Sequence, residues 1–419
     1  MLKRTLVTML LLVGVTASAA QDDIDPALAE QMTNLETITE NLRNLPATEA
    51  VDHQFPTRQE TIDYLSATYS RDFPPEEFDR LERFYVALDL LPADIDLQDV
   101  YLTLLGSQVA GYYDPDTKTM NVLPVVGDDP GTSLSLTEQI IYIHEFTHAL
   151  QDQHFDLNAL LEAPDVLGNP DRSLALTALV EGDATAVMSL YTQEVARRNP
   201  LAALSMLVEG LQAGNLFLPE GIPPILVDEL LFPYNGGLDF VIALSQEGGW
   251  ESVNAAYANP PTTSEQILHP EKYLAGESAQ TVMLEDAASA LGDGWQADWD
   301  TSLGEFYLRE YLDTQLTSSE SLHAAQGWGG DHFRVYHNAS GEIAFALRIV
   351  WDSFADSADF NNLYAKYANS RFDGSMNDDG CWQNATSILC LVLTSETPES
   401  LIVSAPTVEQ ALALRDAAF

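Results

Sequence analysis

The chain has 419 residues, of which 18 are basic and 64 are acidic, so its formal net charge at pH 7 is −46. Nucleic acids and anionic membrane surfaces both require a basic face, so this charge excludes them as partners. The length suffices for two or three domains with cores of their own.

The chain begins with the features of a secretory signal peptide. A short basic start over 1–4 precedes a mostly apolar stretch over 5–15 and small residues over 16–20. The apolar stretch is shorter than the roughly 20 residues of a membrane-spanning helix. We therefore expect cleavage near residue 20 rather than an uncleaved anchor. The mature protein is expected to be secreted or periplasmic, with no stable membrane span once residues 1–20 are removed.

Residues 21–105 are predicted to form an N-terminal helical region. The stretch 21–45 is acidic and weakly periodic, which suits a loose helix or a tail. Apolar residues at helical spacing over 57–91 predict two helices that are separated at Pro75, a residue suited to a helix start. One more short helix is expected over 97–105.

A β-hairpin is predicted over 109–126. Two apolar runs, 109–113 and 119–123, flank a turn that is rich in Pro and Asp. A strand in this position can hold an extended peptide by edge pairing. An ordinary structural hairpin is the alternative.

Residues His144 to His148 read HEFTH, which is the motif HExxH. Residues four apart lie on one face of a helix, so the two imidazoles can bind one metal ion. Glu145 can reach a water on the same ion as a general base. Ser135 and Glu138 have the spacing of a capping box at the start of this helix. Because the helix is otherwise apolar, a metal site is favoured over two partly exposed histidines.

Catalytic zinc needs a third protein ligand besides the two histidines. His154 has the position of the third ligand in the pattern HExxHxxGxxH, but Gln151 stands where that pattern needs a glycine. In a continuing helix, His154 would point away from the face of the motif. Glu181 lies in an apolar helix predicted over 173–197, where an unpaired carboxylate is costly. Arginine partners are scarce in this chain, so we favour Glu181 as the ligand over His154.

With this ligand set, residues 138–184 resemble the gluzincin group of zinc peptidases, of which thermolysin is the familiar member. In that group, two histidines on one helix and a glutamate on a later helix bind zinc. A wider set of segments is similar to a class of exported bacterial proteins: Gly111–Asp114, His144–Gln153, Leu179–Ala184 and Ser264–Pro270. The gluzincin resemblance covers the site and not the flanking domains.

One position departs from the thermolysin-like pattern. That pattern has an Asp four residues after the ligand glutamate, where it orients a zinc-bound histidine. Thr185 occupies this position here, and the nearest aspartate is Asp183. We expect Asp183 to support a ligand in its place. Gly182 would allow two helices, or a ligand, to approach closely.

The resemblance implies a zinc metalloendopeptidase that acts on peptide or protein substrates. Zn²⁺ would be held by His144, His148 and Glu181, and Glu145 would be the general base. Two alternatives come from other classes of protein. One is a non-catalytic, zinc-stabilised extracellular binding or assembly protein, and the other is an extracellular binding protein without a metal.

The oxyanion of a tetrahedral intermediate needs a second electrophile beyond zinc. His269 is the first candidate and Tyr273 the second, with Tyr112 and Tyr113 behind them. A structural role is the alternative for His269, as the cap of a helix that ends at Pro270.

Residues 106–325 are expected to form the catalytic domain and residues 326–419 a C-terminal α+β domain. Strands are predicted in the latter over 333–336, 342–351, 388–393 and 401–403, and helices over 359–368 and 407–417. This ββαββα order predicts a small antiparallel sheet with helices on one face. The fold class is therefore α+β. A mainly helical zincin-like domain has a β-hairpin before the metal helix, and a ββαββα lobe follows it.

The chain has two cysteines, Cys381 and Cys390. In an exported protein, a close pair of cysteines predicts a disulfide bond. Two free thiols are the alternative.

Overall fold

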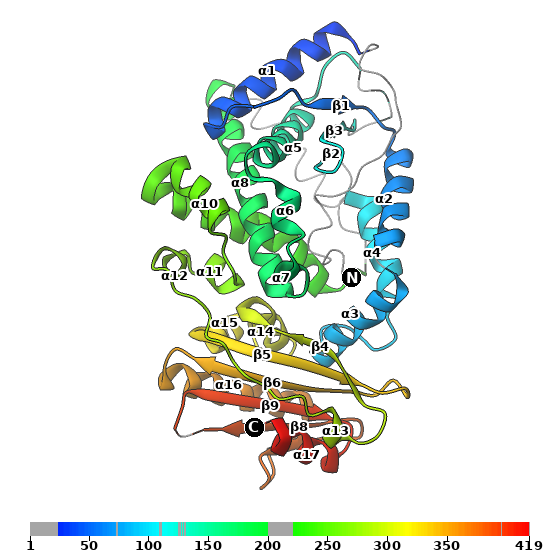
Figure 1. Ribbon diagram of the computed structural model, residues 1–419, viewed down its shortest axis with the longest axis vertical. Coiled ribbons are helices and arrows are strands. Elements are labelled where there is room, and N and C mark those ends of the chain that lie inside the picture. The colour runs from blue at the N-terminus through cyan, green and yellow to red at the C-terminus, as the bar shows by residue number, and fades with distance from the viewer. Residues whose placement is uncertain are drawn as a thin grey trace.

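The computed structural model describes residues 24–418 except 73, 109–110, 125–126, 128, 130, 200–220 and 395. The predicted signal peptide lies outside the described residues, as do both ends of the predicted hairpin. The protein is α+β with two separate sheets. Figure 1 shows a mainly helical part around the smaller sheet and a second part built on the larger sheet.

The mainly helical part is formed by eleven labelled helices in the described chain. They are α1 (Pro26–Arg43), α2 (Arg58–Asp72), α3 (Pro75–Ala87), α4 (Leu97–Gln108), α5 (Leu136–Phe155), α6 (Leu157–Leu161), α7 (Pro164–Leu167), α8 (Pro170–Arg198), α10 (Pro224–Ala258), α11 (Ser264–Leu268) and α12 (Pro270–Leu274).

The smaller sheet contains the predicted hairpin. Strands β2 (Gly111–Asp114) and β3 (Thr119–Val122) pair antiparallel, which confirms the hairpin before helix α5. A short strand that was not predicted, β1 (Asp52–Gln54), pairs parallel to β3, so the strand order is β1-β3-β2. Strand β2 is therefore an edge strand.

Helix α1 is a complete helix rather than the loose helix or tail expected over 21–45. Asp25 caps it by accepting from the backbone N–H of Ala27, and Pro26 occupies its first turn. Its buried residues recur at helical spacing, and three of them join the apolar cluster around α5. The buried residues are Leu28, Met32, Leu35, Thr39 and Arg43.

Helix α5 begins with the predicted capping box, in which Ser135 accepts from the backbone of Glu138 and Glu138 accepts from the backbone of Ser135. It runs without a break to Phe155 and ends at Asp156 in the left-handed conformation. Because Gln151 is helical, the chain does not turn where a third histidine ligand at position 154 would need it to.

Helices α8 and α10 cross with their backbones in direct contact at Gly182 and Gly237. A Cβ added to Gly182 would lie 2.2 Å from the carbonyl carbon of Gly237, and one added to Gly237 would lie 2.0 Å from the carbonyl oxygen of Ala178. The close approach expected of Gly182 is thus made by a helix. Within the described residues, α8 alone is long and apolar enough to span a membrane, and most of that stretch is buried in the protein.

The larger sheet has six antiparallel strands in the order β4-β5-β6-β9-β8-β7. It contains the predicted ββαββα elements and adds the short strand β7 before β8. The disulfide bond between Cys381 and Cys390, which joins β7 to β8, is confirmed. The strands are β4 (Gln296–Thr301), β5 (Trp328–His337), β6 (Ile343–Trp351), β7 (Cys381–Gln383), β8 (Ile388–Leu393) and β9 (Glu399–Ala405).

Helices cover both faces of this sheet, so the expected one-sided arrangement is wrong. One apolar cluster joins α14 (Gly304–Asp313), α15 (Ser318–Ala325) and α16 (Phe354–Phe372) to one face. A second cluster joins α13 (Ala288–Leu291) and α17 (Val408–Ala418) to the other face. Side chains that alternate along each strand supply both clusters.

The predicted domain boundaries do not coincide with the apolar clusters. Strand β4 precedes residue 326 and yet belongs to the larger sheet. Helix α3, from the predicted N-terminal region, packs on the same sheet, where the ring of Phe84 contacts those of Trp299, Tyr307 and Phe333. Helix α1 packs instead on α5. The described residues of 21–105 therefore contribute to two cores that they share with later parts of the chain.

The crossing of α8 and α10 predicts a sharp response to added volume. Gly182→Ala forces two backbones apart, and we expect it to lower the free energy of unfolding by at least about 1–3 kcal/mol. Gly168→Ala is the matched control, because its Cβ would meet only an ordinary contact at 3.7 Å. Urea unfolding of both variants checks this, and equal stabilities would contradict it.

Candidate metal centre

Three polar side chains converge between α5 and α8. His144 Nε2 lies 3.0 Å from Glu181 Oε2 and 3.1 Å from His148 Nε2. His148 Nε2 lies 3.5 Å from the same oxygen of Glu181. Residues His144 and His148 project from one face of α5, and Glu181 faces them from the middle of α8. All three side chains are buried.

These three atoms fit a zinc ion as protein ligands. Ligands at about 2.0–2.1 Å in a tetrahedron are separated by roughly 3.3 Å, and the observed separations of 3.0–3.5 Å bracket this value. Two imidazole nitrogens and one carboxylate oxygen are also a donor set that zinc takes in catalytic sites. The cluster would leave the fourth position for water.

His148 and Glu181 shift each other's pKa values. Burial alone would lower the pKa of His148, but the Glu181 carboxylate outweighs it and raises that pKa. Burial alone would raise the pKa of Glu181, but His148 and His144 outweigh it and lower that pKa. A metal ion competes with protons for the same lone pairs, so metal binding would release protons.

Glu145 lies beside the cluster and against the edge strand β2. Its Oε2 accepts a hydrogen bond of 2.9 Å from the backbone N–H of Tyr113. Burial raises the pKa of Glu145 above its usual range, which suits a group that must take up a proton. A small recess beside it is lined by Gly111, Asn121 and Ile141.

The hairpin is held against helix α5 at a second point. The hydroxyl of Tyr113 donates to Asp152 Oδ2 at 2.7 Å, and the Lys118 ammonium lies 2.5 Å from the same oxygen. The hairpin therefore positions Glu145 relative to the cluster. Edge pairing of a peptide with β2 stays a prediction.

Gln151 contacts the cluster directly. In the sequence, this residue served only as an argument against His154 as a ligand. Its Oε1 lies 2.8 Å from Nδ1 of His148. Its Nε2 donates to the backbone carbonyl of Val180 and to Asp183, at 2.9 and 3.1 Å. Asp183 thus reaches a candidate ligand through Gln151, and its supporting role stays a prediction.

Tyr234 of α10 is the site residue that sequence reasoning missed. Its ring lies 5.9 Å from that of His144, centroid to centroid. Burial raises the pKa of its hydroxyl well above its usual value, and the nearby carboxylates of Glu181 and Glu145 raise it further. A signal was present, because Pro233 inside a helix and Gly237 three residues after Tyr234 mark an unusual stretch.

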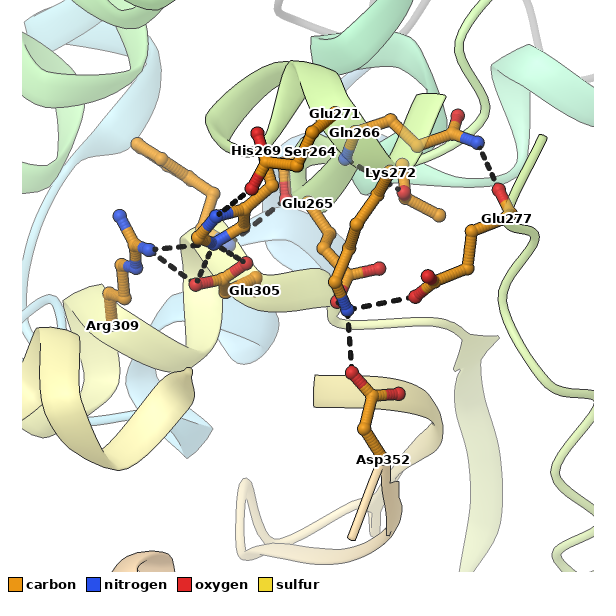
Figure 2. Close-up of polar contacts among 12 residues, drawn as sticks. Ser264, Glu265, Gln266, His269, Glu271, Lys272, Glu277, Glu305, Arg309 and Asp352 are labelled. Carbon is orange, nitrogen blue, oxygen red and sulfur yellow. Dashed lines mark hydrogen bonds and ion pairs between the residues drawn. The ribbon is translucent and has the colours of Figure 1, made fainter. Parts of the chain in front are cut away.

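His269 and Tyr273 are not brought to this cluster, and this corrects their predicted role. Figure 2 shows the imidazole of His269 directed at Glu305 and Arg309. Its Nε2 lies 3.1 Å from Glu305 Oε2, and its backbone caps α11. The Tyr273 hydroxyl donates to the carbonyl of Asn259 at 2.8 Å. These contacts agree with the structural role that was the alternative for His269.

A cluster of three carboxylates lies near His269 (Figure 2). The carboxylates of Glu265, Glu277 and Asp352 surround the ammonium of Lys272, at 2.6–2.8 Å (Figure 2). The lysine occupies the place that a cation would take. This cluster ties α12 to the end of β6 rather than forming a metal site.

The remaining candidates are also engaged elsewhere. Nε2 of His154 lies 2.7 Å from the carbonyl oxygen of Pro46, and its side chain is exposed. Tyr112 packs with Leu123 and Leu65 in a small apolar cluster.

Comparison with known protein families finds a similarity over the C-terminal third of the chain. Residues 274–415 match a family model described as a domain of unknown function, DUF8575. The match begins before β4 and contains the whole larger sheet. No curated protein and no solved structure matches the chain.

The geometry predicts which residue completes the metal centre. Glu181→Gln removes the carboxylate charge that faces both histidines, so we expect the purified protein to lose its bound zinc. His154→Ala should keep about one zinc per chain, because its imidazole is outside the cluster. Metal analysis of the two variants beside the wild type tests the choice. Zinc loss in His154→Ala alone would reverse it.

Proposed function

We propose that this protein is a zinc-dependent metallopeptidase with a zincin-like, gluzincin-type site. The observation that carries the proposal is the convergence of His144, His148 and Glu181, with Glu145 placed beside them. Three zinc ligands and one adjacent carboxylate are the parts that zinc peptide hydrolysis requires. The substrate class is a peptide or protein.

Zinc bound by these three ligands would polarise the scissile carbonyl and lower the pKa of the attacking water. Glu145 takes the proton from that water as the water attacks the carbonyl carbon. The same carboxyl group then gives the proton to the leaving amine. The backbone N–H of Tyr113 holds one oxygen of Glu145, which leaves the other oxygen for this exchange.

Tyr234 replaces His269 as the candidate for the second electrophile. Its ring lies beside His144, and burial together with the nearby carboxylate of Glu181 raises the pKa of its hydroxyl. A phenol at the edge of the cluster can turn to donate to the oxyanion that forms at the carbonyl. Its raised pKa keeps it protonated, as a donor must be.

The proposed location is outside the cytoplasm, in the medium or the periplasm. The disulfide bond supports it, because disulfides persist in oxidising compartments. A non-catalytic, zinc-stabilised binding protein is the competing function. It shares the ligands but gives no role to Glu145.

The role of Glu145 separates these two functions. Glu145→Gln should bind zinc as the wild type does and lose at least about 10²-fold in kcat, because the amide cannot accept the proton. Glu138→Gln, on the same helix, is the matched control, since glutamine also completes a capping box. Digestion of an unfolded protein and of a peptide library measures both. Hydrolysis by Glu145→Gln at the wild-type rate would contradict the peptidase mechanism.

The phenol predicts a different kinetic signature. Tyr234→Phe keeps the ring beside His144 and removes only the hydroxyl. We expect kcat to fall by about 10²–10³-fold with a much smaller change in KM, because the lost hydrogen bond forms only in the transition state. An unchanged kcat would exclude Tyr234 from catalysis.

A further inference from the structure

A continuous chain of buried polar groups joins the N-terminal helix to the candidate metal centre. It begins at Arg43, the last residue of α1, whose side chain is 0% exposed. The guanidinium Nε lies 2.6 Å from Oδ1 of Asp183, and Nη2 lies 3.0 Å from Oδ2. This is a two-pronged ion pair between residues 140 positions apart in the chain.

Asp183 is satisfied entirely by donors. Besides the two bonds from Arg43, it accepts from the hydroxyl of Tyr257 at 2.8 Å and from Nε2 of Gln151 at 3.1 Å. A carboxylate without access to water is stable only when its charge is compensated. Arg43 is the cation that compensates it.

These contacts determine which way the amide of Gln151 faces. Its Nε2 lies between the Val180 carbonyl and the Asp183 carboxylate, both of which only accept hydrogen bonds. A flipped amide would set its oxygen against two acceptor oxygens. The amide oxygen must therefore face His148.

The amide oxygen in turn determines the tautomer of His148. An oxygen 2.8 Å from Nδ1 requires that nitrogen to carry a proton and donate it. Nε2 is then the nitrogen with a free lone pair, and it is the one that faces His144 and Glu181. Within the described residues, Nδ1 of His144 has no such partner, so His148 is the histidine that this chain of contacts orients.

We propose that Arg43 is a positioning residue of the metal centre. It holds Asp183, Asp183 holds the amide of Gln151, and that amide presents the correct nitrogen of His148 to the metal. Helix α1 thus contributes to the geometry of the metal site. The inference rests on the proposed zinc ligands and is independent of whether the protein hydrolyses peptides.

The structure offers variants that separate this role from simple docking of α1. The docking also depends on a hydrogen bond of 2.8 Å from the indole of Trp250 to the carbonyl of Leu42. Trp250→Phe removes that bond and keeps an aromatic ring under Arg43, whose guanidinium lies 4.5 Å from the ring centre. It is the matched control for a change in stability alone.

The experiment measures zinc affinity of the full mature chain by competition with a chromophoric chelator. Arg43→Met and Gln151→Leu should each weaken zinc binding by about 10–100-fold. Each should also change the visible absorption of the Co²⁺-loaded protein. Arg43→Lys, which retains the charge, should recover part of the affinity. Trp250→Phe should unfold at a lower temperature and bind zinc as the wild type does.

The double variant Arg43→Met/Gln151→Leu tests the connection itself. Because both residues act through one chain of contacts, their losses should not add. Additive losses would overturn the proposal, and so would wild-type affinity in Arg43→Met or in Gln151→Leu. Gln151→Leu keeps the Arg43–Asp183 pair, so it tests the proposal even where Arg43→Met does not fold.

The outcome is distinguishable from a failure of the proposed function. A wild-type protein that binds zinc but cleaves no peptide would overturn the peptidase proposal and leave the role of Arg43 standing. Wild-type zinc affinity in Arg43→Met would overturn the role of Arg43 and leave the peptidase proposal standing.

Discussion

A fully buried glutamate that faces two histidines is the constraint on which the helical part of this protein depends. Glu181 sits in the middle of α8, in a buried and mostly apolar stretch of that helix. Burial of such a group is costly unless a positive charge lies close to it. The positions of α5, of the two histidines and of Tyr234 all serve to surround this one carboxylate with partners.

The supporting structure works at two distances from the cluster. Close to it, the backbone contact between Gly182 and Gly237 allows α10 to bring Tyr234 to the candidate ligand His144. Farther out, α1 is held to α8 by the buried ion pair between Arg43 and Asp183. The hairpin is held to α5 by the ion pair between Asp152 and the half-exposed Lys118. In a chain with only 18 basic residues, two of them are used in these positions. The larger sheet, by contrast, is held to the helical part by aromatic packing around Phe84 and by the ion pairs of Lys272.

Local signals in the sequence predicted local features well. The capping box at Ser135, the hairpin before α5 and the disulfide between Cys381 and Cys390 each depend on residues near one another in the chain. Helix α1 was not predicted as a stable element, because what stabilises it is its packing on α5. The placement of β4 in the larger sheet was missed for the same reason, since strand pairing is a long-range interaction.

The sequence by itself determined the chemistry that the site can offer: the spacing of HExxH puts two imidazoles and a carboxylate on one helix, and an apolar helix makes Glu181 conspicuous. Only the tertiary structure decided which residues surround that chemistry. It places Tyr234, and not His269, beside His144. It also brings Gln151 into contact with His148 and joins Arg43 to Asp183 across 140 residues. The physical reason is that hydrogen-bond partners of a buried group are chosen by helix packing, and packing is set by contacts that no local pattern records.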